Sequence, residues 1–284
     1  MSQRKAKETR QQARVPTSEN PKEAPDRRRV PVLSRHSPWA WAVVVLAAVA
    51  VAVGVVAVVG ESGGAAKTPS TGGPQASSGP DAAAALSAIQ RVSATRLVEA
   101  GKPVLFFMGG QFCPFCAADR WAFVKATSRF GTWTNLRALR SQGGVDGFTS
   151  LPTYNLVGAH YRSDLVSLRH KEVADVSGNV LESLDGFEGR LVNSYDPGGS
   201  IPFTVAGGSS GQYTVGLAFS PGLLRGQSFD QLRKALAAGV HNPTVRAIDA
   251  AANAMTALLC KLTGGKPAAV CSVPSITALE SQVG

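Results

Sequence analysis

The polarity pattern of the chain predicts regular secondary structure from about residue 81 onward. Asp81 is suited to cap a helix over residues 81–100, which Gly101 would end. The uninterrupted apolar run 103–108 follows and is typical of a buried strand. Apolar side chains then recur at helical spacing over residues 114–130, so a second helix is expected directly after this strand.

The middle of the chain carries shorter patterns. A strand is expected near 152–158, and a less regular extended stretch near 164–169. Residues 171–182 predict turns and edge structure, and residues 184–195 predict a short helix.

The last third of the chain has clearer signals. The apolar segments 201–205 and 213–219 are separated by a loop rich in Gly and Ser, a pattern that predicts a β-hairpin. Ser228, with Gln231 three positions later, is a capping-box signature for another helix. A final amphipathic helix is expected to begin at Asn242-Pro243 and to end at the next Gly-Gly pair.

A hydrophobic segment before the domain predicts a membrane anchor. Residues 39–59 are 21 positions without a charge, rich in Val and Ala. At about 1.5 Å per residue, a helix of this length spans the roughly 30 Å of bilayer hydrocarbon. A cleaved signal peptide is the alternative, but it normally has a shorter basic region and a shorter apolar core. Arg27-Arg28-Arg29 and Arg35 precede the segment, so the N-terminus is expected in the cytoplasm and the C-terminal part outside it.

The charge is concentrated at the N-terminus. The chain has a formal net charge of +10, and residues 1–38 hold ten Lys or Arg against four Asp or Glu. No basic stripe with interleaved aromatic residues is present in the rest of the sequence, so no nucleic-acid partner is expected. The expected parts are a basic cytoplasmic tail (1–38), a transmembrane helix (39–59), a flexible Gly/Ser/Pro linker (60–80), a globular domain (81–240) and a C-terminal helix and tail (241–284).

The sequence Cys113-Pro114-Phe115-Cys116 is the strongest candidate for chemistry. It lies where the buried strand meets the following helix, and Pro114 suits a first helical turn because its missing N–H is not needed there. Cys113 is then expected beside unpaired backbone N–H groups and the positive end of the helix dipole, which lowers the pKa of a thiol. The pair is therefore predicted to exchange disulfides, with Cys116 one turn inside the helix.

Other interpretations of this pair have less support. A permanent structural disulfide and half of a zinc site remain alternatives. A zinc site would need a second close pair, whereas Cys260 and Cys271 are eleven positions apart, and a c-type haem would need His in place of Ala117. No metal is expected, because the four histidines show no ligand spacing: His36, His160, His170 and His241.

The order of these elements resembles the thioredoxin superfamily over roughly residues 85–240. The resemblance implies an α/β fold, a thioredoxin-like mixed sheet flanked by helices, here preceded by a single transmembrane helix. In that family a cis-proline before the third strand lies across from the C-x-x-C, and the residue before it offers backbone groups to the substrate peptide. Pro202 and Ile201 match these positions, so the resemblance implies that they bind substrate. A trans proline in a surface turn is the alternative.

The chain departs from ordinary thioredoxins in several respects, among them the C-P-F-C motif in place of C-G-P-C and Phe112 in place of the usual preceding Trp. Phe107 stands where thioredoxins carry a buried acid that helps to move the proton of the second thiol. Without that acid, Cys116 would be deprotonated by water or by another group. The long interval between Cys113 and Pro202 implies an insertion around residues 146–196, before the cis-Pro strand, which could shape a substrate groove.

The whole chain is also similar to an uncharacterised membrane-anchored group, catalogued as domain of unknown function 929. The similarity lies in the F-C-P-F-C block, in the tract 130–136 and in the ending from Cys260 to Cys271. Cys260 and Cys271 are expected to form a structural disulfide that ties the last helix to the tail and contributes about 3 kcal/mol. A second redox pair that relays electrons to the first is the alternative.

We therefore expect a membrane-anchored extracytoplasmic thiol–disulfide oxidoreductase that acts on protein cysteines. Cys113 would be the attacking thiolate and Cys116 the resolving thiol, while Ile201 and Pro202 hold the backbone of the client. The expected partners are client proteins with cysteines and a membrane or extracytoplasmic redox partner, and no cofactor is expected. The alternative is a non-catalytic thioredoxin-like binding or scaffold domain whose Cys113–Cys116 disulfide is permanent.

Overall fold

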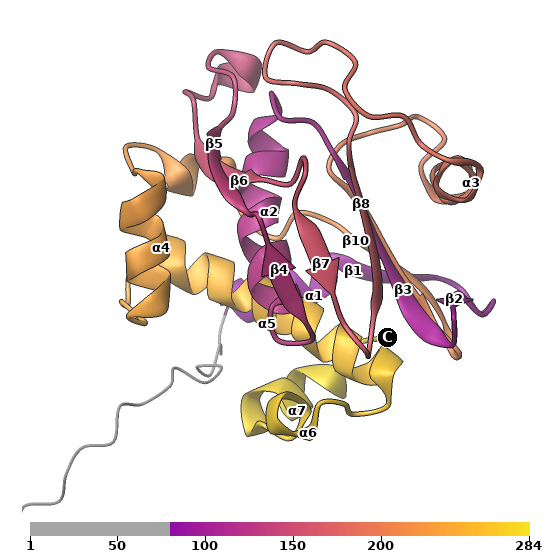
Figure 1. The fold of residues 1–284 in the computed structure, drawn as a ribbon. Coiled ribbons are helices and arrows are strands. Elements are labelled where there is room, and N and C mark those ends of the chain that lie inside the picture. The colour runs from indigo at the N-terminus through magenta and orange to yellow at the C-terminus, as the bar shows by residue number, and fades with distance from the viewer. Residues whose placement is uncertain (1–79) are drawn as a thin grey trace, which may run out of the picture. The chain divides into compact units, whose positions relative to one another are not determined.

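The computed structural model describes residues 80–284 of the chain (Figure 1). The predicted basic tail, the transmembrane segment 39–59 and nearly all of the predicted linker lie outside these residues. Within residues 80–284, no helix has both the length and the apolar character that a membrane crossing requires.

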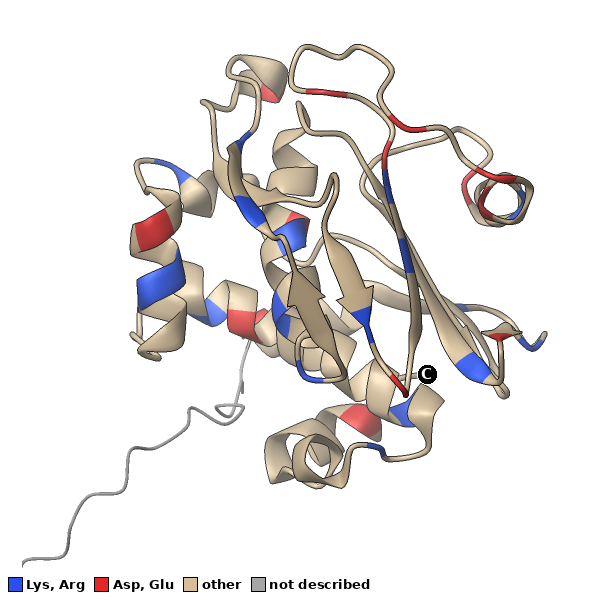
Figure 2. Ribbon diagram, in the orientation of Figure 1, with Lys and Arg blue, Asp and Glu red and all other residues tan. Residues whose placement is uncertain are grey.

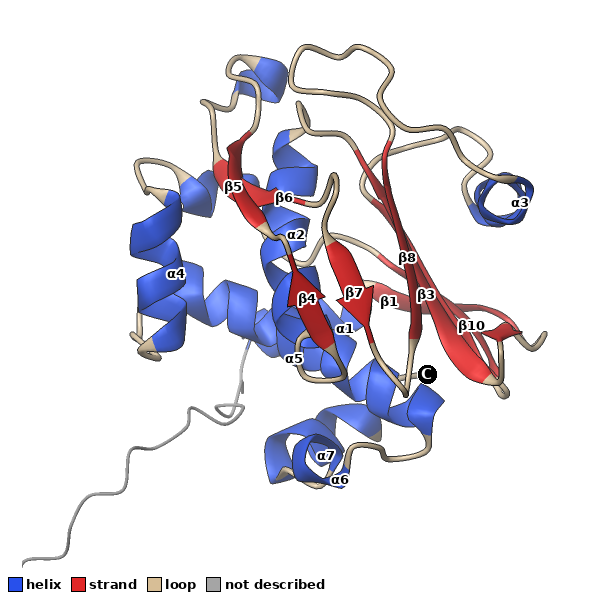
Figure 3. Cartoon of the chain, in the orientation of Figure 1, coloured by secondary structure: helices blue, strands red, loops and turns tan. Residues whose placement is uncertain are grey.

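A mixed sheet forms the centre of this part of the chain (Figures 1 and 3). Four antiparallel neighbours follow one another in the order β1 (Ile89–Ser93), β10 (Gly211–Val215), β9 (Phe203–Gly208) and β3 (Lys102–Gly109). On its other side, β3 pairs in parallel with β8 (Ser167–Glu172), and its first residues pair with the short β2 (Val98–Glu99). β3 is therefore an interior strand with partners on both sides.

Helices cover both faces of the sheet. Phe106 of β3 belongs to an apolar cluster with α3 (Gly186–Tyr195) on one face. Leu105 and Phe107 point to the other face, where α2 (Pro114–Thr127) and α5 (Pro243–Thr263) pack against the sheet. Because both faces are covered, β3 is buried along almost its whole length, which confirms the strand predicted from its unbroken apolar run.

Short elements surround this core. They are α1 (Pro80–Ser87), β4 (Thr132–Thr134) paired with β7 (His160–Arg162), β5 (Arg137–Arg140) paired with β6 (Pro152–Asn155), the 3₁₀ turns Val145–Gly147 and Pro221–Leu224, α4 (Phe229–Ala237), α6 (Ala268–Cys271) and α7 (Pro274–Glu280). The C-terminal α6 and α7 follow α5 and pack beside it (Figure 3).

The predicted helix over residues 81–100 is wrong in its second half. α1 ends at Ser87, and the chain continues as β1, which pairs with β10 at an edge of the sheet. The open edge of β10 accepts a strand there, and the β-branched Ile89 and Val92 suit that conformation. Tertiary pairing thus overrides an apolar spacing that also fits a helix.

The later predictions agree better with the structure. The hairpin is confirmed as β9 and β10, and the capping box is confirmed by the reciprocal bonds of Ser228 and Gln231 at the start of α4. α5 begins after Asn242 and ends at Gly264, which has the left-handed conformation typical of a helix end. The extended stretch near 164–169 is confirmed in part, because β8 starts at Ser167 and runs on to Glu172.

The range 146–196, expected as an insertion, supplies parts of the core. It contains β8 of the central sheet as well as β6, β7 and α3. Arg169 of β8 forms ion pairs with Asp185 and Glu188 at the start of α3, and with Glu99 of β2. Figure 2 shows the acidic positions of the loop between β8 and α3 and of α3 itself. These ion pairs connect α3 to the sheet edge that β8 forms.

Candidate functional site

The predicted redox motif lies at the junction of β3 and α2. Cys113 is the N-cap of α2, with an extended backbone, and Pro114 is the first residue of the helix. The Cys113 Sγ accepts a hydrogen bond from the backbone N–H of Cys116 at 3.2 Å. This geometry confirms that the Cys113 sulfur faces the free N–H groups of a helix start. Both cysteines are free thiols in this structure, and both are buried.

The two thiols have opposite pKa shifts. The pKa of Cys113 is lowered, chiefly by the side-chain hydrogen bond with Cys116, and further by backbone N–H groups and the charge of Arg120, while burial acts against this shift. The pKa of Cys116 is raised well above that of an ordinary thiol, first by burial and then by its hydrogen bond with Cys113. As the pH rises, the proton is therefore lost first from Cys113.

The structure brings Ile201 and Pro202 to the same place. The Cys113 thiol donates a hydrogen bond to the carbonyl oxygen of Ile201 at 3.8 Å. The Ile201–Pro202 peptide bond is cis, and Pro202 directly precedes β9. Because Phe203 pairs with Met108 near the end of β3, the start of β9 lies beside the segment that leads to Cys113. All four residues proposed from the sequence for this site are thus neighbours.

Two glycines after β3 allow this close approach. A Cβ atom on Gly110 would lie 2.9 Å from Cδ1 of Ile201 and 2.9 Å from the ring of Phe112. A Cβ atom on Gly109 would lie 2.8 Å from the ring of Phe107 and 3.4 Å from Nη2 of Arg120. Real Cβ atoms essentially never come closer than 3.0 Å to such neighbours, so both positions favour glycine.

An aromatic contact lies beside the motif at Phe115. The half-buried Phe115 packs edge-to-face on Phe148 with ring centroids 5.5 Å apart. The guanidinium of Arg225 lies 5.3 Å from the Phe148 ring centre, and its Nη2 donates to the carbonyl of Gly147. Phe148 and Arg225 were not identified from the sequence, because both lie in irregular segments far from the cysteines. Aromatic surface and one cation thus lie beside Phe115 of the motif.

A buried ion pair lies next to the motif on α2 and was also missed. Arg120 donates from Nε to Oε1 of Glu172 at 2.7 Å and from Nη2 to Oε2 at 2.5 Å. Both side chains are 0% exposed. Phe107, which replaces the acid expected there, packs on Phe123, and the Arg120 guanidinium lies 5.9 Å from its ring centre. The sequence did hold one sign of this ion pair, because Arg120 is a charged residue one turn after Cys116 in a largely apolar helix.

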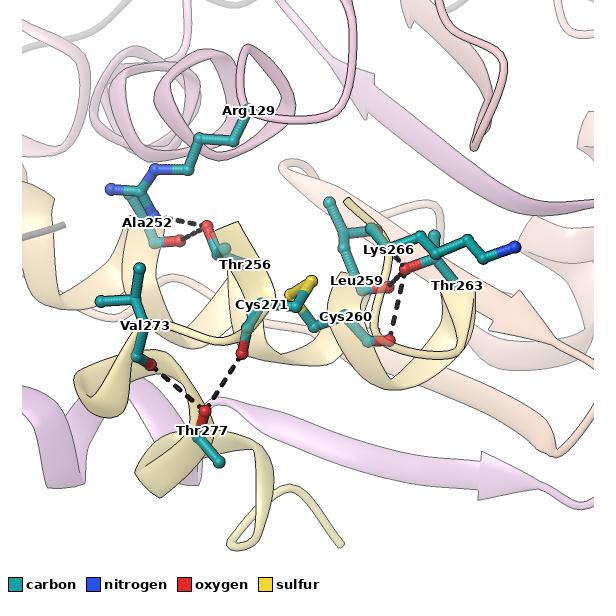
Figure 4. The surroundings of a disulfide bond; sticks show 10 residues. All are labelled: Arg129, Ala252, Thr256, Leu259, Cys260, Thr263, Lys266, Cys271, Val273 and Thr277. Atoms are coloured by element: carbon teal, nitrogen blue, oxygen red, sulfur yellow. Dashed lines mark hydrogen bonds between the residues drawn. A yellow bond between two sulfur atoms is a disulfide. The ribbon is translucent and has the colours of Figure 1, made fainter. Parts of the chain in front are cut away.

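The second cysteine pair is a disulfide away from this site. Cys260, near the end of α5, is bonded to Cys271 of α6 (Figure 4). Leu262, two residues after Cys260 on α5, packs close to Gly208 at the end of β9. The neighbouring Gly207 pairs with Val104, near the start of β3. The disulfide is therefore at the opposite end of β3 from Cys113. A direct relay between the two pairs has no support in this arrangement, because exchange requires contact of the sulfurs.

Hydrogen bonds fix the ends of the disulfide-closed segment. The hydroxyl of Thr277 donates to the carbonyl oxygen of Cys271 at 3.1 Å, and that of Thr263 donates to the carbonyl oxygen of Lys266 at 2.6 Å (Figure 4). The Lys261 ammonium donates to the carbonyl oxygen of Val283, which holds the C-terminal tail against α5. The pair thus has the setting of a structural disulfide.

The described part of the chain holds no group of three or more His, Cys, Asp or Glu side chains that could bind a metal ion.

Comparisons with known proteins locate the same region. No curated protein and no solved structure matches the chain. Residues 88–183, which include β3, the cysteine motif, α2 and β8, match the protein family described as "Domain of unknown function (DUF929)".

Proposed function

We propose that this protein is a thiol–disulfide oxidoreductase that acts on protein cysteines outside the cytoplasm, anchored in the membrane by residues 39–59. The observation that carries this proposal is the pairing of two free thiols with opposite pKa shifts at one helix start. A nucleophilic thiol with a lowered pKa and a buried partner thiol within hydrogen-bond reach is the arrangement that disulfide exchange requires.

The sheet supports the finer proposal of a thioredoxin-like fold. The strand before the cysteine motif has a parallel neighbour that follows α2 in the chain, and an antiparallel neighbour that begins at the cis-proline. A further antiparallel strand and a covering helix, α5, follow. This order agrees with the resemblance drawn from the sequence, in which Ile201 and Pro202 hold the client backbone.

The reaction with a client disulfide conserves atoms and electrons. The Cys113 thiolate attacks one sulfur of the client, a bond forms between them, and the other client sulfur leaves as a thiolate that takes a proton from water. Cys116 then loses its proton and attacks the Cys113 sulfur, which forms the Cys113–Cys116 disulfide and releases the first client sulfur. The client disulfide gains two electrons and the pair loses two; the reverse sequence oxidises a client dithiol. A partner dithiol or disulfide restores the starting state.

The test uses the full chain with Cys116→Ser, which should halt the reaction at the mixed disulfide. We expect this variant to accumulate disulfide-linked client proteins that are released by a reducing agent. The matched control, Cys113→Ser with Cys116→Ser, should accumulate none. The proposal is wrong if Cys116→Ser captures no partner although its Cys113 reacts with an alkylating agent, or if the native pair stays oxidised in cells and resists added dithiol.

A further inference from the structure

The buried ion pair of Arg120 and Glu172 is built into the elements that form the cysteine motif. Arg120 lies four residues after Cys116 on α2, so both side chains lie on the same face of the helix. Glu172 is the last residue of β8, opposite Gly109 in the ladder with β3. The pair therefore joins the helix that carries both cysteines to the strand ends beside them.

A shared carbonyl group connects this pair to the nucleophile. The carbonyl oxygen of Gly110 accepts a hydrogen bond from Nη2 of Arg120 at 2.8 Å and another from the backbone N–H of Cys113 at 3.2 Å. The Nη1 atom of Arg120 is buried and has no hydrogen-bond partner within residues 80–284. Arg120 thus has donor capacity that neither Glu172 nor Gly110 uses.

We propose that Arg120 and Glu172 set the charge state of the two thiols: Arg120 stabilises their thiolate forms, and Glu172 positions Arg120 and limits its effect. The catalytic meaning of this inference rests on the proposed function. The electrostatic claim itself concerns only the ionisation of Cys113 and Cys116.

The electrostatic reason lies in the burial of the charges. A guanidinium stays protonated in proteins, so Arg120 is a permanent positive charge on a fully buried side chain. Its charge favours the thiolates of both Cys113 and Cys116 and thereby lowers the pKa of each. For Cys116, the charge of Arg120 opposes the rise in pKa that burial causes, and so eases the loss of the thiol proton before Cys116 attacks the mixed disulfide. The side chain of Phe107 has no group that could accept this proton.

Three other ionisable side chains lie near the pair: Asp119, His170 and Glu182. The Glu182 carboxylate accepts a hydrogen bond from the backbone N–H of Glu172 at 2.7 Å. His170, two residues earlier on β8, packs on Trp133 with ring centres 5.5 Å apart. Asp119 precedes Arg120 on α2, and its carboxyl is influenced by the Arg120 charge. Glu172 alone forms an ion pair with Arg120 among the described residues.

Two variants of the full chain, both with Cys116→Ser so that only Cys113 of the motif titrates, give opposite expected results. Glu172→Gln leaves the charge of Arg120 uncompensated, so the pKa of Cys113 should fall. Arg120→Met with Glu172→Met removes both charges, a replacement that buried ion pairs often tolerate. There the pKa of Cys113 should rise, because the charge of Arg120 that lowers it is gone, and alkylation by iodoacetamide at neutral pH should slow by about twofold or more.

The control replaces another ion pair of α2. Lys125→Met with Asp249→Leu removes the pair between α2 and α5 and should leave the pKa of Cys113 unchanged. A purely structural role of Arg120 and Glu172 would change stability but leave the pKa of Cys113 the same, or move it in one direction in both variants. Either result overturns the proposal.

A measurement on the unaltered chain keeps the inference testable if the variants do not fold. The ¹⁵N resonance of Arg120 Nε should move as the Cys113 thiol titrates, and a resonance that stays constant through that titration overturns the proposal. These outcomes are separable from failure of the proposed function, which would appear as the absence of trapped clients while the thiol still responds to Arg120 and Glu172.

Discussion

The carbonyl oxygen of Ile201 accepts a hydrogen bond from the Cys113 thiol at 3.8 Å, although 88 positions separate the two residues in the chain. The contact exists because β9 begins next to the end of β3, and because Gly110 leaves room for the Ile201 side chain. If the proposed function holds, a client peptide bound at Cys113 would lie beside the backbone of Ile201.

The first prediction concerns the space at Gly110. Gly110→Ala places a Cβ atom 2.9 Å from Cδ1 of Ile201 and from the Phe112 ring, so both side chains must move. We expect a loss of about 1–3 kcal/mol in the free energy of unfolding, the usual range for an overpacked site. In the Cys116→Ser background, the yield of mixed disulfides should also decrease. Urea unfolding and non-reducing gels measure the two effects.

Ile201→Val is the matched second change. It removes Cδ1, one of the three atoms that the new methyl group meets, so the double variant should regain part of the lost stability and trapping. The explanation is contradicted if Gly110→Ala behaves like the parent in both measurements, or if Ile201→Val adds a further loss to the double variant.

The second prediction concerns the hydrogen bond between the two thiols. The side-chain bond from Cys116 is the largest cause of the lowered pKa of Cys113. Cys116→Ala removes that donor, whereas Cys116→Ser keeps a hydroxyl in its place. The pKa of Cys113 should therefore be higher in the alanine variant than in the serine variant. The pH dependence of iodoacetamide alkylation gives both values, and equal values would contradict the assigned cause.

The helical parts of the fold were predictable where local signals and tertiary packing agree. The capping box at Ser228 and the helix from Asn242 to Gly264 follow from hydrogen bonds within a few residues, and both are observed. Residues 89–100 were assigned wrongly, because the decisive interaction is the pairing of β1 with β10 more than 100 positions away. No local pattern carries that pairing.

The candidate site was also predictable where its residues are close in sequence, and not where they meet through the pairing of distant strands. Cys113 and Cys116 lie within one helical turn, and Ile201 and Pro202 followed from the order of elements. Arg120 could be noticed as a charge in an apolar helix, but its partner Glu172 lies on a strand whose register with β3 is set by the whole sheet. Arg120 and Glu172 meet only because β8 pairs with β3 in this register, so no short sequence motif contains both of them.

The third prediction concerns the disulfide at the end of α5. Cys260→Ala with Cys271→Ala opens a link between residues 11 positions apart, and the free energy of unfolding should fall by about 3 kcal/mol, mainly because the unfolded chain gains freedom. Trapping by Cys113 in the Cys116→Ser background should persist under conditions where the variant is folded. Urea unfolding provides the measurement. A stability equal to that of the parent chain, or loss of trapping in the folded variant, would contradict the structural role.

The fourth prediction concerns the buried carboxyl group of Asp119 on α2. Burial raises the pKa of Asp119 to about 7, although the charge of Arg120 acts in the opposite direction. The unfolded chain loses this proton near the ordinary Asp value of about 4. Between about pH 4 and pH 7 the folded state therefore holds more protons than the unfolded state at this position, and its contribution to stability falls as the pH rises.

Asp119→Asn should remove this dependence, because the amide has a similar shape and no charge. Above about pH 7 the variant should be more stable than the parent chain by about 2–4 kcal/mol, since the parent must bury a carboxylate or leave its helix packing. Below about pH 4 the two should differ little, because Asp119 is then protonated in both states. Urea unfolding across this pH range measures the difference. Asp230→Asn, an exposed change on α4, is the control and should leave the slope unaltered. If Asp119→Asn keeps the slope of the parent chain, another group causes it, and the raised pKa of Asp119 is wrong.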